Sequence, residues 1–329
     1  MNIKPIFFAG IIAIGAINAT QVASQTIWDV SIPWGPAEFH TINAEKFAAA
    51  VSEATAGEVQ MVIHPGGALG IRANESLRAV EDGAVPMAEY ALFQNVGDLP
   101  ILGIESIPFM INDYAELRRM HDLIRPVWEE ELRTRNQMAL YIVPWPSQNF
   151  FTKEPLLTAA DLEGVRMRVY DANTSTMISN LGMAPQQMNN PDIIPALATG
   201  RLDAVMTSGS TAVSQKYWDF LNHTYTTNHL WASNAMTVNL DAWNEISAEH
   251  QQIILDLAAQ MEPGFWTISE AEHGTRMDTL VAEGMTVEAP SDELAALMRE
   301  ATAGMASGFI AENPLAGPII EAFRASAGN

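Results

Sequence analysis

Short strand-like runs and helix-like runs alternate along most of this chain, and no flexible linker separates them. The strand-like runs, with alternating or continuous apolar residues, lie at 26–33, 58–64, 84–90, 138–144, 166–170 and 203–206. Helix-like runs bounded by capping residues and glycines lie between them. This order predicts an α/β fold with mostly parallel sheets that are flanked by helices on both faces.

The length of 329 residues is too great for most single cores, so we expect two lobes. Without a linker, the lobes must be joined by strands or helices that cross between them, and that geometry leaves a cleft. A helical stretch at 248–283, interrupted at Pro263–Gly264, would be about 50 Å long and should brace both lobes. A short strand at 285–290 and a final helix over 291–311 complete the pattern.

The first 24 residues have the three parts of a secretory signal peptide. Lys4 precedes an apolar run at 6–19, and a polar stretch follows. The run is shorter than the ~20 apolar residues of a membrane span, although an uncleaved anchor is the alternative. We therefore expect a soluble exported protein, in the simplest case a periplasmic one.

The charge balance and the motif search disfavour several classes of function. With 39 acidic and 17 basic residues, the net charge of −22 repels nucleic acids and anionic lipids. There is no cysteine, and none of the common catalytic, nucleotide-binding or metal-binding motifs occurs. We expect no catalytic residues, no metal and no cofactor, and a binding protein is favoured over an enzyme.

Two of the scarce arginines, Arg166 and Arg168, lie in one strand-like run, GVRMRVYDAN at 164–173. Side chains alternate along a strand, so both arginines share one face while Met167 and Val169 face the core. A solvated strand face that pairs with nearby acids is one interpretation. The other is an anion clamp, because a guanidinium can hold a carboxylate through two parallel hydrogen bonds.

Hydroxyl, amide and indole groups occur where strands pass into helices or loops. TSGST at 207–211 follows a strand, and MNNPDIIP at 188–195 opens a helix. Such groups can bind an anion, although a plain helix cap is the alternative. Trp34, Trp145 and Trp231 lie in loops at strand ends, where they can line a pocket or pack in a core.

Taken together, these segments resemble the extracytoplasmic solute-binding proteins of TRAP transporters (tripartite ATP-independent periplasmic transporters), the DctP-type group. The resemblance covers essentially the whole chain after residue 24. It is carried by HPGGALGIRANESLRAVEDGAVPMAE (64–89), ESIPFMINDYAELRRM (105–120), DLEGVRMRV (161–169), LGMAPQQMNNPDIIPALATGRLDAV (181–205) and NLDAWNEISAEHQQIILDLA (239–258).

The resemblance implies that Arg168, which closes the run Gly164-Val165-Arg166-Met167-Arg168, grips the carboxylate of a ligand. The same family pattern assigns ligand contacts at other positions. Those positions, together with Asn190 from the helix start at 188–195, are Thr207, Ser208, Gln148, Asn149, Glu89, Tyr90, Trp34 and Trp231. The loop before the arginine run, PWPSQNFF, lacks the second arginine of acidic-sugar binders, which disfavours sialic-acid-like ligands.

The family also implies a two-lobed periplasmic binding protein (type II-like) with a long helix bracing both lobes. Lobe I would comprise 25–146 plus about 236–280, and lobe II 147–235 plus about 281–329. The cleft would close on a small carboxylate, such as an aromatic, hydroxy- or keto-acid, and deliver it to the small and large membrane subunits of an ion-gradient-driven permease. An exported enzyme acting on an organic acid, or a ligand-binding partner of a sensor receptor, remains as an alternative.

Overall fold

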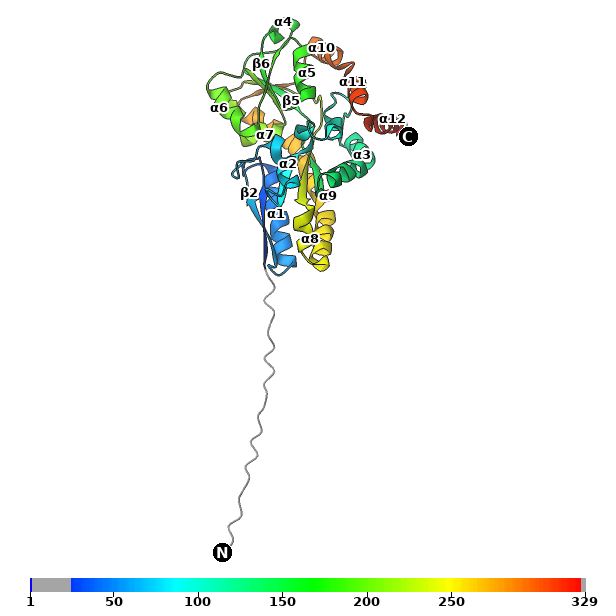
Figure 1. Ribbon diagram of the computed structural model, residues 1–329. Coiled ribbons are helices and arrows are strands. Elements are labelled where there is room, and N and C mark those ends of the chain that lie inside the picture. The colour runs from blue at the N-terminus through cyan, green and yellow to red at the C-terminus, as the bar shows by residue number, and fades with distance from the viewer. Residues whose placement is uncertain (2–24, 327–329) are drawn as a thin grey trace.

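The computed structural model describes residue 1 and residues 25–326. The predicted signal peptide therefore lies outside the described residues, apart from Met1. Two sheets, each flanked by helices, lie one above the other in Figure 1. The predicted α/β fold with sheets flanked by helices is confirmed, and each sheet is mixed, with parallel and antiparallel pairs.

The first sheet has the strand order β2-β1-β3-β10-β4. Its strands are β1 (Thr26–Ser31), β2 (Val59–His64), β3 (Met87–Ala91), β4 (Gln137–Pro144) and β10 (Ser233–Asn239). Helices α1 (Phe39–Ala54), α2 (Ser76–Glu81), α3 (Tyr114–Thr134) and α8 (Leu240–Glu245) pack against these strands. Strand β10 runs antiparallel to its neighbours β3 and β4, whereas β1 is parallel to β2 and β3.

The second sheet has the strand order β11-β9-β5-β8-β6-β7. Its strands are β5 (Asn149–Thr152), β6 (Arg166–Val169), β7 (Ala184–Gln187), β8 (Ala204–Thr207), β9 (His223–Tyr225) and β11 (Thr286–Glu288). The helices of this layer are α4 (Ala159–Leu162), α5 (Ala172–Asn180), α6 (Ile193–Ala198), α7 (Gly209–Ser214) and α10 (Asp292–Thr302). Strand β5 is antiparallel to β8 and β9, whereas β6 is parallel to β7 and β8.

In each sheet one strand runs antiparallel to the rest: β10 in the first sheet and β5 in the second. Each of these strands directly follows a segment that crosses from one sheet to the other. Residues 145–148 lead from β4 to β5, and residues 226–232 lead back from β9 to β10. Backbone hydrogen bonds tie the two crossing segments together, from Trp145 N to the Ala232 carbonyl (2.8 Å) and from Gln148 N to the Leu230 carbonyl (3.0 Å). As expected, no flexible linker joins the two layers at this point. Two hydrogen-bonded segments of the chain cross between them instead.

The long helix α9 (Ala248–Ala282) packs against both layers. It contacts α1 and β4 of the first layer and α7 and β11 of the second. The predicted interruption at Pro263–Gly264 is wrong, because the helix continues through Pro263. The lost backbone hydrogen bond is offset by the burial of Phe265 and Trp266. Among the described helices, α9 included, none has both the length and the apolar character needed to cross a membrane.

The C-terminal region differs from the single helix expected over 291–311. Two helices, α10 and α11 (Met305–Glu312), occupy that range, and α12 (Ala316–Ser326) follows. Helix α10 packs against α4 and α5 of the second layer, whereas α12 packs against α3 of the first. The helices after β11 therefore contact both layers, with α10 on the second and α12 on the first.

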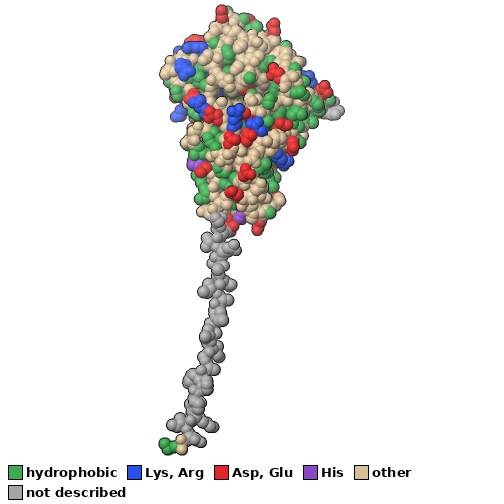
Figure 2. Space-filling model, in the orientation of Figure 1, with side chains coloured by type: hydrophobic (Ala, Val, Ile, Leu, Met, Phe, Trp, Pro, Cys, Tyr) green, Lys and Arg blue, Asp and Glu red, His purple; other side chains and the backbone are tan. Residues whose placement is uncertain are grey.

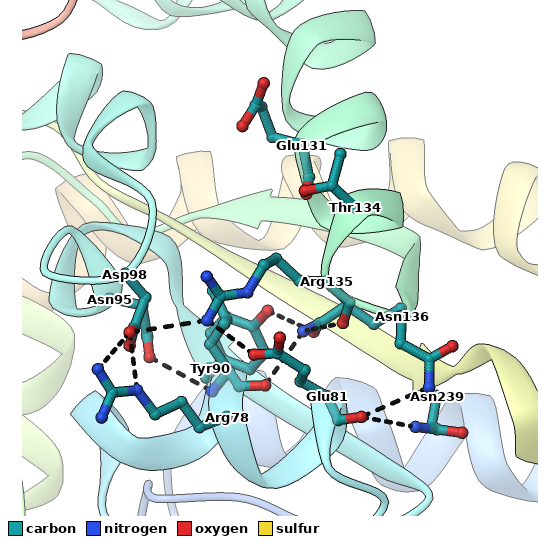
Figure 3. Close-up of polar contacts among 12 residues, drawn as sticks. Arg78, Glu81, Tyr90, Asn95, Asp98, Glu131, Thr134, Arg135, Asn136 and Asn239 are labelled. Atoms are coloured by element: carbon teal, nitrogen blue, oxygen red, sulfur yellow. Dashed lines mark hydrogen bonds and ion pairs between the residues drawn. The ribbon is translucent and has the colours of Figure 1, made fainter.

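Short 3-10 helices connect several of these elements. They are η1 (Ala73–Glu75), η2 (Leu92–Asn95), η3 (Pro100–Ser106), η4 (Asn190–Asp192) and η5 (Tyr217–Asp219). The region of η1, α2 and η2 is tied to the end of α3 by a group of ion pairs, which Figure 3 shows around Arg135. Arg135 Nη2 lies 2.7 Å from Glu81 Oε2 and 3.7 Å from Asp98 Oδ1, and Arg78 Nη2 lies 2.6 Å from the same Asp98 oxygen.

Acidic and basic side chains are interspersed on the face shown in Figure 2, with several Lys and Arg side chains near its middle. Seven of the thirteen arginines form an ion pair with an acidic side chain. Of the arginines without such a pair among the described residues, all are exposed except one, which is buried between the two sheets.

Candidate functional site

A small cavity lies between the two sheets, at the carboxyl ends of several strands. In α/β proteins this is the usual place for a ligand. From the first sheet's side it is lined by Trp34, Phe93, Gln94 and Trp145, which follow β1, β3 and β4. From the second side it is lined by Arg168 and Tyr170 at β6 and by Thr207, Ser208 and Thr211 around the end of β8. Gln148 and Asn190 complete the lining.

Arg168 is held in this cavity by backbone carbonyls. Its Nε donates to the Met188 carbonyl (3.2 Å) and its Nη1 to the Met206 carbonyl (3.0 Å). Its Cζ lies 5.1 Å from the centroid of the Tyr170 ring, within range of a cation–π interaction. These contacts fix the guanidinium plane and use two of its five N–H groups.

The charge of Arg168 is buried without a matching anion. The residue is 3% exposed, and among the described residues no carboxylate lies within 4.0 Å of its guanidinium. Burial lowers the pKa of the guanidinium from its ordinary value, but arginine remains charged in proteins. The neighbouring carboxylate of Asp171 instead caps α5, where it accepts hydrogen bonds from Thr174 N (2.7 Å) and Thr174 Oγ1 (2.6 Å).

Arg166 lies on the same strand in a different environment. Its Nε and Nη2 lie 2.7 Å and 2.5 Å from the two carboxylate oxygens of Asp203, and its side chain is 44% exposed. This solvated ion pair raises the pKa of Arg166 and lowers that of Asp203. The two interpretations of the arginine run therefore apply to different arginines, with Arg166 in the solvated pair and Arg168 in the cavity.

The hydroxyl-rich segment after β8 enters the cavity as expected. Ser208 is the N-cap of α7, and its Oγ accepts a hydrogen bond from Thr211 N (3.3 Å). Thr207 lies at the end of β8, opposite Asn149 of β5. Asn190 lies in η4 and accepts a hydrogen bond from Gln215 Nε2, rather than capping a helix as predicted. Gln148 is oriented by a hydrogen bond from its Nε2 to the Pro146 carbonyl (2.8 Å).

The structure does not bring Asn149, Tyr90, Trp231 or Glu89 into the lining of this cavity. The Asn149 side chain bonds to the backbone of Ser147 and Asn228, and Tyr90 donates to Gln137 Oε1 (2.7 Å). The indole of Trp231 donates to the Ile111 carbonyl (2.9 Å). In these three residues the polar group of the side chain is held by a partner within the fold.

Glu89 supports the cavity wall from behind. It is fully buried and bonds to His40 Nδ1 (2.9 Å) and Asn234 Nδ2 (3.0 Å). Asn234 Oδ1 in turn accepts a hydrogen bond of 2.7 Å from the indole of Trp145, which lines the cavity. Glu89 thus positions a wall residue through Asn234, a role that sequence reasoning did not anticipate.

Sequence reasoning missed Phe93, Gln94, Tyr170 and Thr211 as lining residues. Tyr170 follows Arg168 at the spacing that places it on the same strand face, so the alternation of side chains could have found it. Phe93 and Gln94 lie in η2, just after the carboxyl end of β3, where no residue pattern marks them. Their position in the cavity lining depends on which strands are neighbours in the first sheet.

Contacts across the cavity join the two layers. Phe93 and Tyr170 meet edge to face, with ring centroids 4.8 Å apart. Beside the cavity, Glu38 at the start of α1 accepts a hydrogen bond from Ser214 Oγ of α7 (2.7 Å). Burial raises the pKa of Glu38 to about 7. The structure therefore holds the two layers together around the cavity.

Comparison with known proteins decides the family. A model of bacterial extracellular solute-binding proteins, family 7 (DctP), matches residues 30–312. The chain belongs to this family. The predicted resemblance to DctP-type proteins is confirmed, and members of the family are solute-binding receptors rather than enzymes.

Solved DctP-type structures share the whole fold. An extracytoplasmic solute receptor of Bordetella pertussis, DctP7, which binds pyroglutamic acid, is 30% identical with a TM-score of 0.88, covering 91% of this chain and 99% of that one. A marine metagenome TRAP solute-binding protein specific for pyroglutamate is 27% identical with a TM-score of 0.88, covering 92% and 99%. Among relatives matched by sequence, a solute-binding protein of Chromohalobacter salexigens is 24% identical over 75% of this chain and 74% of its own length.

Proposed function

We propose that this chain captures a small organic carboxylate between its two layers, with Arg168 as the anchor for the carboxylate. One observation carries the proposal: a buried guanidinium lines the cavity, and no described carboxylate lies within 4.0 Å of it. Burying an unpaired charge is costly, so a fold keeps one where a ligand supplies the opposite charge. The membership of the chain in a solute-binding family supports this.

The relatives favour a compact acid. Two of the similar receptors bind pyroglutamate, a small cyclic acid, which makes pyroglutamate the first compound to test. Thr207 and Ser208 would add hydroxyl groups beside the guanidinium, and Gln148 and Asn190 would add amides.

Two lobes would close on this ligand. Lobe I would comprise 25–146 plus about 236–280, and lobe II 147–235 plus the segment from about 281 through α10. The paired crossing segments 145–148 and 226–232 would serve as the hinge, together with α9. The position of the cavity between the layers supports this division, because a ligand held from both sides stabilises the closed arrangement.

The bound acid would then pass unchanged to the small and large membrane subunits of a TRAP transporter. The marine metagenome relative is a TRAP solute-binding protein, and the family is extracellular, which support a periplasmic location and a cleaved signal peptide. Recovering the acid after incubation and finding it chemically unchanged by mass spectrometry would agree with binding without catalysis.

A thermal-shift screen against a library of organic acids, followed by calorimetric titration, tests the proposal. An acid at about 100 times its Kd adds about 2.7 kcal/mol of stability, enough to raise Tm by several degrees. Pyroglutamate is compared with its neutral primary amide, 5-oxoprolinamide, as the matched control. We expect the acid to bind and the amide to bind at least a hundredfold more weakly. Equal binding, or no stabilisation by any acid, would reject a carboxylate receptor.

A further inference from the structure

Three polar atoms of cavity-lining residues are buried without a hydrogen-bond partner among the described residues. One is the hydroxyl of Tyr170, which neighbours Arg168, and the other two are the indole N–H of Trp34 and the side-chain oxygen of Gln94. Trp34 is 4% exposed and Gln94 is 9% exposed, so bulk water reaches neither of them freely. Buried polar groups are nearly always paired in folded proteins, and those that are not call for a partner from outside the chain.

Trp34 and Gln94 lie on the wall opposite Arg168. Trp34 follows the carboxyl end of β1 and Gln94 follows the carboxyl end of β3, and these strands are neighbours in the first sheet. Arg168 lies on β6 of the second sheet. The cavity therefore has a positively charged side and, across from it, a neutral polar side.

A neighbouring tryptophan shows that the unpaired indole is specific to this position. Trp145 also lines the cavity and packs edge to face against Trp34, with ring centroids 5.1 Å apart. Its N–H, unlike that of Trp34, donates to Asn234 within the fold. Two similar indoles thus have different roles, with one N–H used by the protein and one left for another partner.

We propose that Trp34 and Gln94 form a second recognition point, which selects carboxylates that carry an amide or lactam group at the end away from Arg168. This inference rests on the proposed function and narrows its ligand class. It narrows the expectation of an aromatic, hydroxy- or keto-acid, because a purely hydrocarbon tail would leave both polar atoms buried and unpaired.

The chemistry of the two side chains sets the requirement. An indole N–H can only donate, so the ligand must present an acceptor such as a carbonyl oxygen. A carboxamide presents an acceptor and a donor side by side, which matches the N–H and C=O of a cis amide in a ring. A keto-acid satisfies the indole alone, whereas a lactam acid satisfies both groups.

Calorimetric titration with three acids of similar size tests the ligand N–H and the ligand carbonyl separately. Pyroglutamate has the ring N–H and the carbonyl, 3-oxocyclopentane-1-carboxylate keeps the carbonyl alone, and cyclopentanecarboxylate has neither. We expect the affinity of the wild-type chain to fall about tenfold or more at each removal, because a site built to pair with a polar group rejects analogues that lack it. Binding of cyclopentanecarboxylate within threefold of pyroglutamate would overturn this inference while leaving carboxylate binding intact. A chain that binds no acid at all would instead reject the proposed function.

Two substitutions assign the effect to the two side chains. Trp34→Phe should weaken pyroglutamate and the keto-acid about tenfold or more and change cyclopentanecarboxylate less than threefold. Gln94→Met should weaken pyroglutamate most, since only the lactam uses the amide fully. Trp145→Phe is the matched control and should weaken all three acids by a similar factor, because its N–H serves the wall. The same uniform loss in Trp34→Phe would show that Trp34 is only a wall residue.

The same variants decide the case in which another acid from the library binds better than pyroglutamate. Each acid that binds the wild-type chain is then titrated against Trp34→Phe. Acids with an acceptor away from the carboxylate should lose affinity about tenfold. A tight ligand that lacks any second polar group would contradict the inference directly.

Discussion

Replacing Arg168 by alanine is the most direct test of the site, because Arg166 on the same strand provides a matched control. The two side chains share a strand face, yet Arg168 is 3% exposed and Arg166 has a side chain that is 44% exposed. Arg166 is paired with Asp203, whereas Arg168 is held by two backbone carbonyls. A ligand carboxylate would thus depend on Arg168 and be nearly indifferent to Arg166.

The expected magnitude follows from the remaining N–H groups of Arg168. Each hydrogen bond between a guanidinium and a carboxylate contributes about 1.5–3 kcal/mol, and leaving a buried charge without its partner costs about 3–5 kcal/mol. Arg168→Ala should therefore lower affinity at least a hundredfold, about 2.7 kcal/mol. Arg166→Ala removes a solvated pair worth at most about 1 kcal/mol to stability, and it should change affinity less than threefold.

Isothermal titration with pyroglutamate, or with the tightest acid from the library, measures both variants. Arg168→Lys should recover only part of the loss, because an ammonium lacks the planar fork that holds a carboxylate through two bonds. Urea unfolding of the free variants checks that each one is folded. Equal losses of affinity in Arg168→Ala and Arg166→Ala, with both variants folded, would refute the assignment.

Three further perturbations test the structure around the site. Because burial raises the pKa of Glu38 from 4.5 to about 7, the folded chain binds this proton more tightly than the unfolded chain does. The unfolding free energy of the wild type, relative to that of Glu38→Gln, should therefore fall by on the order of 3 kcal/mol as pH rises from about 4.5 to about 7. Urea titrations of both proteins at pH 5 and pH 8 measure this change. A difference that does not vary with pH would contradict a buried, protonated Glu38. Gly103→Ala places a methyl group 2.8 Å from a valine side-chain carbon and should cost about 1–3 kcal/mol of unfolding free energy, whereas Gly308→Ala, with open space around it, should be neutral or stabilising by up to about 1 kcal/mol. Equal urea midpoints for the two alanine variants would contradict this packing. Asn234→Ala removes the acceptor of the Trp145 indole and should weaken every carboxylate by a similar factor in calorimetric titrations, so a loss confined to one acid would argue for direct contact with that ligand.

Local sequence features predicted the elements that are stabilised by local interactions. Asp113 caps α3 and accepts from Glu116 N (2.8 Å), and the two residues stand three apart in the sequence, which is the spacing of a capping box. The limits of β2 and β4 agree with their apolar patterns to within one residue. The interruption at Pro263 was predicted wrongly, because burial of α9 against both layers overrides the local cost of proline, and a local pattern carries no such information.

Strand pairing between distant parts of the chain determines which residues reach the cavity, and local sequence patterns do not reveal it. Glu89 and Tyr90 lie on β3, close to the cavity in sequence terms, yet β10 and β4 supply partners that hold both side chains inside the first layer. Gln94 carries no pattern that marks it, and it lines the cavity because η2 ends up beside the residues that follow β1. Such residues become visible only when the strand order is known.

The difference between Arg166 and Arg168 comes from the register of one strand pair. Strand β6 is parallel to β8, with Met167 opposite Ala204 and Arg168 opposite Val205. This register places Asp203 beside Arg166, where Asp203 N donates to the Arg166 carbonyl (3.0 Å) and its carboxylate pairs with the Arg166 side chain. Two residues further along, the neighbouring strand offers Arg168 only the Met206 carbonyl and no acid. One acid at the amino end of β8 thus neutralises the first arginine, whereas no such acid lies at the carboxyl end of β8, and the second arginine stays available for the ligand that we propose.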